Sequence, residues 1–132
     1  MRKLIVSNFV TLDGYYEGKD KNIASLFDYQ HADYSGDDSF DFYNAERLRA
    51  ADFLLLSRTA FLGNQTFWPG VAVDNHATAI RREIAGLMSS IEKIVISDHL
   101  TAAELSPWEN TRVIQRANAL CRDCRAQAAA QR

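Results

Sequence analysis

Short apolar runs, several of them rich in β-branched residues, alternate with segments of helical periodicity, and this alternation most restricts how the chain can fold. Three such runs lie at 53–56, 93–97 and 111–115. Parallel strands need long crossover connections, usually helices, so this order predicts right-handed βα units and a mainly parallel α/β sheet. A fourth run, Lys3–Val10, is apolar with little alternation, and it predicts a central strand buried on both faces.

The helical segments have recognisable ends. Ser39 is the expected cap of a first helix that begins at Phe40, and Asp52 ends it. A short helix is expected after 57–59, up to about Gly63, with a turn at 68–70.

A longer helix is expected from a cap at Asn75 to Ser90, and the tail, 117–132, has the composition of a terminal helix. The longer helix shows apolar residues at i, i+4, i+7 and i+8, which is typical of a face turned to a core. These residues are Ile80, Ile84, Leu87, Met88 and Ile91.

Length and charge exclude several classes of protein. The chain has 132 residues and a formal net charge of −2, so we expect a single domain over 1–132 with no overall attraction to nucleic acid. No apolar run approaches the ~20 residues of a membrane helix. The basic start resembles a signal peptide, but the apolar run breaks at Ser7, so we expect a cytoplasmic protein that does not bind membranes.

The two cysteines form a single C-x-x-C in the tail, Cys121 and Cys124. One such pair can be redox-active or half of a zinc site, but it follows no βα turn and no second pair exists. We interpret both as structural or incidental thiols and expect no metal site.

Polar residues follow each predicted strand. In an open parallel sheet, ligands bind beyond the carboxyl ends of the strands. Strand ends always meet loops, however, so polar residues are also expected there without a ligand. The residues concerned are Asn8, Thr11, Asp13 and Gly14, then Ser57, Arg58 and Thr59, then Ser97, Asp98 and His99, and last Gln115 and Arg116. Gly14 can adopt the positive φ of a turn.

Ser57-Arg58-Thr59 is the most informative of these groups. A helix that starts there offers unpaired backbone N–H groups and a partial positive charge, which suit a phosphate. The guanidinium adds a forked donor that matches phosphate oxygens. The alternative is an ordinary Ser or Thr cap beside a solvated arginine, and the residue types leave both open.

Three segments together resemble the dihydrofolate reductase-like superfamily, and most closely the reductase domain of bacterial riboflavin biosynthesis. They read KLIVSNFVTLDGYYEG, then FLLLSRTAFLG followed by FWPG, then KIVISDHLT followed by SPWENTRVI. They occur in family order and span about residues 1–116. The resemblance implies a three-layer fold with a mainly parallel central sheet flanked by helices. It also implies hydride transfer from NADPH to a small heterocyclic or carbonyl substrate.

The resemblance also implies roles for individual residues. The strand-one end would line the place where nicotinamide meets substrate, the turn after strand two would grip cofactor phosphate, and the end of strand three would lie near the adenosine ribose and its 2′-phosphate. An acidic residue on the first helix would face the substrate ring. These residues are Val10, Thr11, Leu12, Asp13 and Gly14 at the end of strand one, Arg58 and Thr59 in the turn after strand two, Ser97 and Asp98 at the end of strand three, and Asp41 on the first helix. Asp13 and Asp41 are the candidate catalytic residues.

Two features depart from the family. Ser57 stands where the family has glycine, which puts the close backbone approach to phosphate in doubt. The family also continues with further strands, a Gly-Gly loop and a closing β-hairpin that this sequence lacks. A sheet without those strands has an exposed edge, so we expect a homodimer or larger homo-oligomer, or a second chain that supplies the missing strands.

Three functions follow from these observations. The first is an NADPH-dependent reductase, for which folate, a ribosylamino-pyrimidine and other small carbonyl compounds stay open as substrates. The second is a catalytically impaired remnant that persists as a folded, oligomerising α/β domain. The third is a phosphate- or nucleotide-binding module unrelated to reduction. Binding of NADPH separates the first two.

Overall fold

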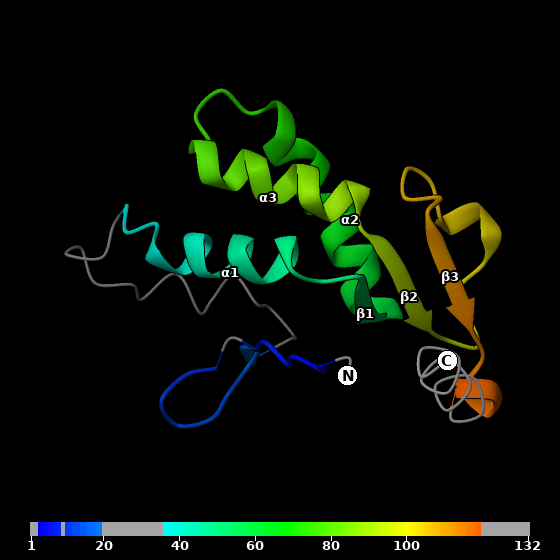
Figure 1. Cartoon of the computed structure of the whole chain (residues 1–132). Helices are drawn as coiled ribbons and strands as arrows, with labels where there is room; N and C mark the ends of the chain where they lie inside the picture. The colour runs from blue at the N-terminus through cyan, green and yellow to red at the C-terminus, as the bar shows by residue number, and fades with distance from the viewer. Residues whose placement is uncertain (1–2, 9, 20–35, 120–132) are drawn as a thin grey trace. The chain divides into compact units, whose positions relative to one another are not determined.

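The computed structural model describes residues 3–8, 10–19 and 36–119, and the chain forms two compact units, Met1–Asp37 and Asp38–Arg132. The second unit is a small α/β fold (Figure 1). Its elements are α1 (Ser39–Arg49), β1 (Phe53–Ser57), α2 (Arg58–Val73), α3 (Ala79–Ser90), β2 (Glu92–Ile96), the 3-10 helix η4 (Ala102–Glu104) and β3 (Thr111–Ile114).

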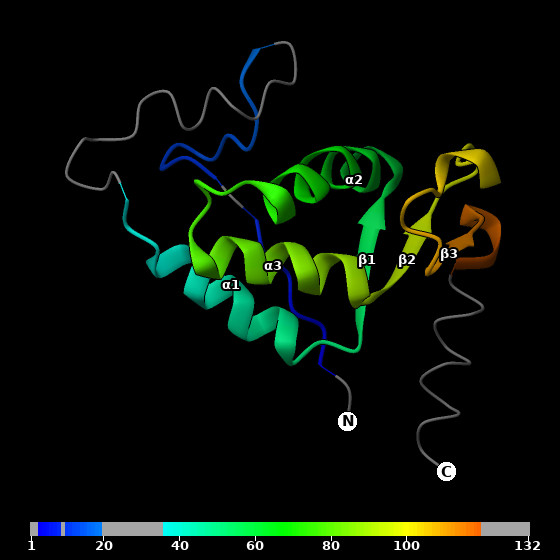
Figure 2. The same ribbon diagram turned by 90° about the horizontal axis from the view of Figure 1, so that it is seen from above.

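The three strands form one parallel sheet in the order β1-β2-β3 (Figure 2). Leu54 pairs with Lys93, which in turn pairs with Thr111. Helices α2 and α3 connect β1 to β2, as expected for parallel strands that need a crossover. The predicted parallel α/β sheet is confirmed. At most of their ends, the strands differ from the predicted runs by a single residue.

The core lies between one face of the sheet and the helices. Ile80, Ile84 and Met88 are buried along α3, which confirms the predicted apolar face of that helix. They pack with Phe61 of α2 and Val95 of β2. Helix α1 lies beside α3 in Figures 1 and 2, and its Ala45 joins the same cluster.

Helix α2 extends well beyond its predicted end. It continues through Trp68-Pro69-Gly70 to Val73, so the predicted turn at 68–70 is wrong. Trp68 packs against the core, and its Nε1 donates a hydrogen bond to Asn64 Oδ1 at 2.8 Å. These contacts hold the residue before Pro69 in the helix, and they outweigh the local preference of proline for a helix boundary.

Two caps also differ from the predictions. Helix α1 includes Ser39, and Asp38 precedes it without a side-chain capping bond. Helix α3 is capped by Thr78, whose Oγ1 accepts a hydrogen bond from Arg81 N at 3.4 Å. Asn75 instead lies in a turn where His76 N donates to Asp74 Oδ1 at 2.8 Å.

In the first unit, the predicted central strand is wrong. The described residues of the run, 3–8 and 10, belong to no strand, and Leu4 and Val6 are 81% and 74% exposed. Apolar, β-branched composition favours a strand but supplies no partner for its backbone hydrogen bonds. The turn after the run is confirmed, because Gly14 has φ 89° and its N–H donates to Thr11 O at 2.9 Å.

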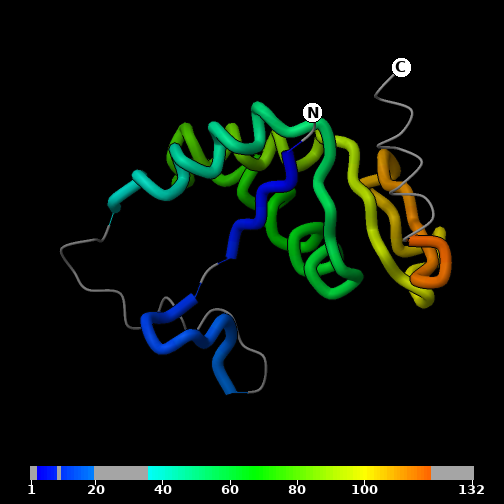
Figure 3. The backbone as a smooth tube through the Cα atoms, turned by 60° about the horizontal axis from the view of Figure 1, so that its bottom comes forward, coloured from blue at the N-terminus to red at the C-terminus, as the bar shows by residue number. Residues whose placement is uncertain are grey.

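Some predictions fall on residues that the structure does not describe. Most of the polar loop at 15–38 lies within 20–35, and of the predicted tail helix only 117–119 are described, in a helical turn that starts at Arg116. Within the described ranges, no helix has the length and apolar character to cross a membrane. Figure 3 traces the backbone of the chain from end to end.

Candidate functional site

The carboxyl end of β1 passes directly into α2. Ser57 is the last residue of the strand and the N-cap of the helix, and its Oγ accepts a hydrogen bond from Ala60 N at 3.2 Å. Arg58 is therefore the first residue of α2, and Thr59, which is exposed, is the second. This is the strand–helix junction that the sequence predicted, with Ser57 as its cap.

The carboxyl end of β2 lies beside this junction, because Ser57 pairs with Ile96. Ser97 is 6% exposed, and its Oγ accepts hydrogen bonds from the N–H groups of His99 and Leu100, both at 3.1 Å. Asp98 Oδ1 accepts from Arg116 N at 3.0 Å. Ser97 therefore shapes the loop after β2, and Asp98 ties it to the chain after β3.

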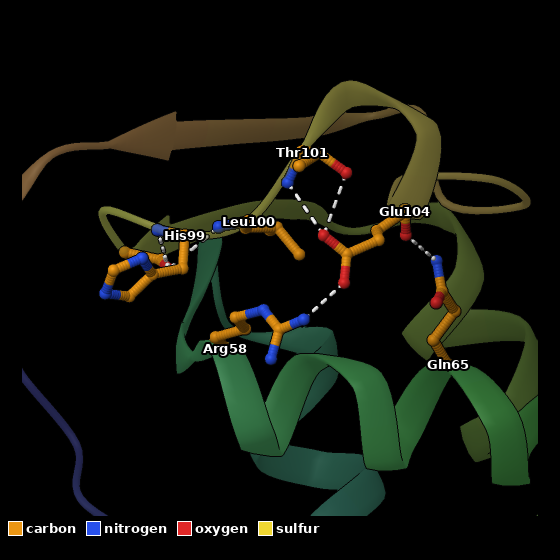
Figure 4. A network of polar contacts seen from close by, with 7 residues as sticks. Arg58, Gln65, His99, Leu100, Thr101 and Glu104 are labelled. Carbon is orange, nitrogen blue, oxygen red and sulfur yellow. Dashed lines mark hydrogen bonds and ion pairs between the residues drawn. The ribbon is translucent and has the colours of Figure 1, made fainter.

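Arg58 forms an ion pair with a residue that sequence reasoning missed. Its Nη2 donates to Glu104 Oε1 (Figure 4). The other carboxylate oxygen, Oε2, accepts from Thr101 N and from Thr101 Oγ1, both at 2.9 Å. Thr101 and Glu104 form the capping box of η4. The T-x-x-E spacing is visible in the sequence and is a known helix-start signal, so it could have indicated this arrangement.

Gln65 attaches the same loop to α2. Its Nε2 donates to the carbonyl oxygens of Glu104, Leu105 and Ser106, at 3.0, 2.9 and 2.9 Å. In Figure 4, Gln65 and Arg58 lie along α2 and both reach toward the loop that carries Glu104. Two sets of contacts therefore fix the position of the Glu104 carboxylate. One is its own capping box, and the other is the set of hydrogen bonds from Gln65 to the backbone of the loop.

The electrostatics of the site are nearly balanced. Hydrogen bonds from the backbone and side chain of Thr101, and then from Arg58, lower the pKa of Glu104 below its usual value. Glu104 is thus ionised at neutral pH and compensates the charge of Arg58. The Nε of Arg58 is shielded from solvent and has no hydrogen-bond partner among the described residues. Arg116 Nε lies 3.7 Å from Asp98 Oδ2, so this pair is balanced as well.

The remaining predicted site residues lie elsewhere in the chain. Asp41 is in the first turn of α1, and its Oδ2 lies 3.9 Å from Arg81 Nε of α3. Burial raises the pKa of Asp41, Arg81 opposes this and Asp38 adds to it. Five residues of the predicted site belong to the first unit: Val10, Thr11, Leu12, Asp13 and Gly14. There Thr11 Oγ1 donates to Asp13 Oδ1.

The structure thus brings five of the predicted residues to one edge of the sheet: Ser57, Arg58, Thr59, Ser97 and Asp98. A shallow hollow of ≈ 440 Å³ lies instead at the amino-terminal ends of β2 and β3. Its lining is polar and charged: Ser90, Glu92, Glu109, Asn110, Thr111 and Arg112.

Comparison of the chain with protein-family models, curated proteins and solved structures found no match. The functional argument therefore depends on the geometry of this edge and on the residues that the sequence carries there.

Proposed function

We propose that this chain is an NADPH-dependent reductase of the dihydrofolate reductase-like type, with that family's three-layer fold, and that Arg58 and the start of α2 bind a cofactor phosphate. The observation that carries the proposal is the junction at Ser57, where a parallel strand ends and a helix begins with an arginine. The first-turn N–H groups of a helix and its partial positive charge favour an anion, and a guanidinium donates in a matching fork.

A phosphate can take the place of the Glu104 carboxylate at Arg58. A carboxylate and a phosphate both accept from a guanidinium fork, so Glu104 occupies one of the donors that a phosphate uses. Thr59, the second residue of α2, is exposed and offers a hydroxyl in the same first turn. Binding therefore requires Glu104 to release Arg58, and this release lowers the affinity.

The other assignments follow from the family resemblance. Ser97 and Asp98 would lie near the adenosine ribose, where Arg116 beside Asp98 offers a cation for the 2′-phosphate. NADPH supplies the hydride, and residues of the chain bind and orient it. On the substrate side, the resemblance assigns Val10, Thr11, Asp13 and Gly14 to the place where nicotinamide meets substrate. Asp41, whose pKa is raised by burial, is its separate candidate for the acidic residue that faces the substrate ring.

The second candidate is a folded domain that does not bind cofactor. The ion pairs favour it, because the charge of Arg58 is compensated by Glu104 and that of Arg116 by Asp98. In this case the network of Figure 4 is structural, and it holds the loop after β2 against α2.

Titration with NADPH by calorimetry distinguishes the two. If the proposal holds, Arg58→Ala weakens binding by about 1.5–3 kcal/mol, the usual cost of a lost charged hydrogen bond. Glu104→Gln strengthens it, because the variant keeps an acceptor for Thr101 but removes the competing charge. Arg82→Ala is the matched control, since Arg82 Nη1 donates to Ala77 O in a different part of the fold.

Each outcome of the titration has a clear meaning. Wild-type protein that binds neither NADPH nor NADH supports the second candidate, provided that Glu104→Gln also fails to bind. Binding that Arg58→Ala leaves unchanged removes Arg58 from the site. Equal affinity for NADPH and NADH contradicts a contact to the 2′-phosphate.

A homo-oligomer is part of the same proposal. β1 and β3 are the edge strands of the described sheet, and an edge strand presents backbone groups to another chain. We expect light scattering at micromolar protein to report a dimer or a larger species. A monomer over the whole concentration range would contradict the homo-oligomer but would not bear on the proposed cofactor binding.

A further inference from the structure

Arg58 and Gln65 lie on the same face of α2. They are two helical turns apart, which is about 10 Å along the helix axis. Both reach the loop after β2 (Figure 4). Arg58 donates to the carboxylate of Glu104, whereas Gln65 Nε2 donates to the backbone carbonyl oxygens of Glu104, Leu105 and Ser106. The loop is therefore attached to α2 at two places, and Glu104 takes part in both.

The ion pair between Arg58 and Glu104 depends on how well Glu104 is positioned. The two side chains are 42% and 30% exposed. An ion pair this open to solvent contributes little by itself, because water screens the charges and two flexible side chains must be held in one geometry. Here the Glu104 side chain is already ordered by Thr101, and its backbone is already held by Gln65. This prior ordering strengthens the contact with Arg58.

The contacts of Glu104 can be separated from one another. Its Oε1 accepts from Arg58 and its Oε2 accepts from Thr101, so the capping box does not require the arginine. Gln65 binds backbone oxygens of the loop and carries no charge. A change at Gln65 therefore alters the position of Glu104 and leaves both charges of the ion pair in the protein.

We propose that Gln65 is a positioning residue that keeps Glu104 on Arg58, and that residues 101–106 thereby act as an inhibitory latch over the phosphate site at the start of α2. The latch rests on the proposed function, since it acts on the same arginine. While it is closed, a phosphate must displace Glu104. Because the ion pair is partly exposed, this exchange needs no unfolding. Withdrawal of Gln65 from the loop frees Arg58 and raises its affinity for a phosphate.

The rate at which phenylglyoxal modifies Arg58, measured by peptide mass spectrometry, tests the latch without any cofactor. A guanidinium held by a carboxylate reacts more slowly than a free one. Gln65→Met keeps the length of the side chain but removes its donor. We expect this variant to speed modification of Arg58 at least ~3-fold, as is usual for residues coupled in one hydrogen-bond network.

Arg49 is the matched control within the same molecule. Its Nη2 lies 2.7 Å from Glu83 Oε1, and its side chain is 49% exposed, close to the value for Arg58. This second ion pair joins α1 to α3 and has no contact with the latch. Its rate of modification should be the same in wild type and in Gln65→Met. An equal increase at Arg49 and Arg58 would show general loosening of the fold and would overturn the proposal.

A double-mutant cycle shows whether Gln65 acts through Glu104. Glu104→Gln should by itself speed modification of Arg58, and Gln65→Met should then add nothing, because no carboxylate is left to position. The same increase from Gln65→Met in both backgrounds contradicts a positioning role. So does a rate at Arg58 that Gln65→Met leaves unchanged in the otherwise wild-type protein.

Calorimetry with NADPH separates the latch from the proposed function. Gln65→Met should bind NADPH at least ~3-fold more tightly than wild type. NADPH binding that is no tighter in this variant overturns the latch and leaves the reductase proposal in place. If Arg58 becomes more reactive in Gln65→Met but no variant binds NADPH, Glu104→Gln included, the proposed function fails and the positioning role of Gln65 stands.

Discussion

Trp108→Ala is expected to lower the free energy of unfolding by about 3–5 kcal/mol, the usual cost of removing a buried aromatic side chain. Trp108 is 2% exposed. Its ring meets that of Phe61 edge to face, with the centroids 5.9 Å apart, and Lys93 Nζ lies 4.6 Å from its centroid. The variant therefore leaves a cavity and also removes an aromatic pair and a cation–π contact.

Chemical denaturation followed by circular dichroism measures this effect. Trp108→Phe is the matched control, because it keeps an aromatic ring in the same place. Trp108 Nε1 is buried without a hydrogen-bond partner among the described residues, so phenylalanine gives up no hydrogen bond there. We expect Trp108→Phe to lower the free energy of unfolding by less than half as much as Trp108→Ala. Equal costs, or an Ala variant as stable as wild type, would contradict the central place of Trp108 in the core.

The same residue matters to the candidate site. Trp108 N donates to Leu105 O at 2.6 Å, and Gln65 binds the carbonyl oxygens of 104–106 from α2. The loop that carries Glu104 is therefore anchored at one end by the buried ring of Trp108 and along its middle by the side-chain amide of Gln65. Loss of the ring should loosen the Arg58–Glu104 pair along with the core.

Lys93 is expected to make the protein more stable as the pH rises from 8 to 10.5. The side chain is fully buried beneath Trp108. Its Nζ donates to Ser89 O, Ile91 O and Asn110 Oδ1 at 3.1, 2.8 and 3.2 Å, but no carboxylate is among these partners. Burial lowers the pKa of Lys93 from 10.5 to about 8.

The direction of the effect follows from proton linkage. Between pH 8 and 10.5 the unfolded chain still holds the proton of Lys93, whereas the folded chain has released it. Stability rises with pH wherever the unfolded state binds more protons. The penalty for burying the charge is fully present below pH 8 and disappears above 10.5, which amounts to at most about 3 kcal/mol.

Lys93→Met isolates this contribution from tyrosines and other groups that titrate in the same range. The variant removes the charge and keeps much of the volume. Asn110 Nδ2 still donates to the carbonyl oxygens of Ser89, Ser90 and Ile91, so the end of α3 stays capped. The difference in unfolding free energy between wild type and variant should change with pH over 8–10.5. A constant difference would show that Lys93 keeps an ordinary pKa in the fold.

Local patterns in the sequence predicted the elements that local physics determines. The apolar runs marked β1, β2 and β3 to within about a residue, and the spacing of Ile80, Ile84 and Met88 identified the buried face of α3. The sequence indicated a Ser or Thr cap at 57–59, because a cap is a contact between near neighbours in the chain, and the structure shows that it is Ser57. The polar edge of the sheet followed from the parallel order of the strands.

Tertiary structure decided what depends on distant residues. Arg58 and Glu104 are 46 residues apart, and no local rule pairs them, so the compensation of the arginine became visible only in the fold. Trp68 holds α2 through a proline that predicts a turn by itself. The run at 3–10 has the composition of a strand, but a strand forms through hydrogen bonds to a neighbour, and composition does not provide that neighbour.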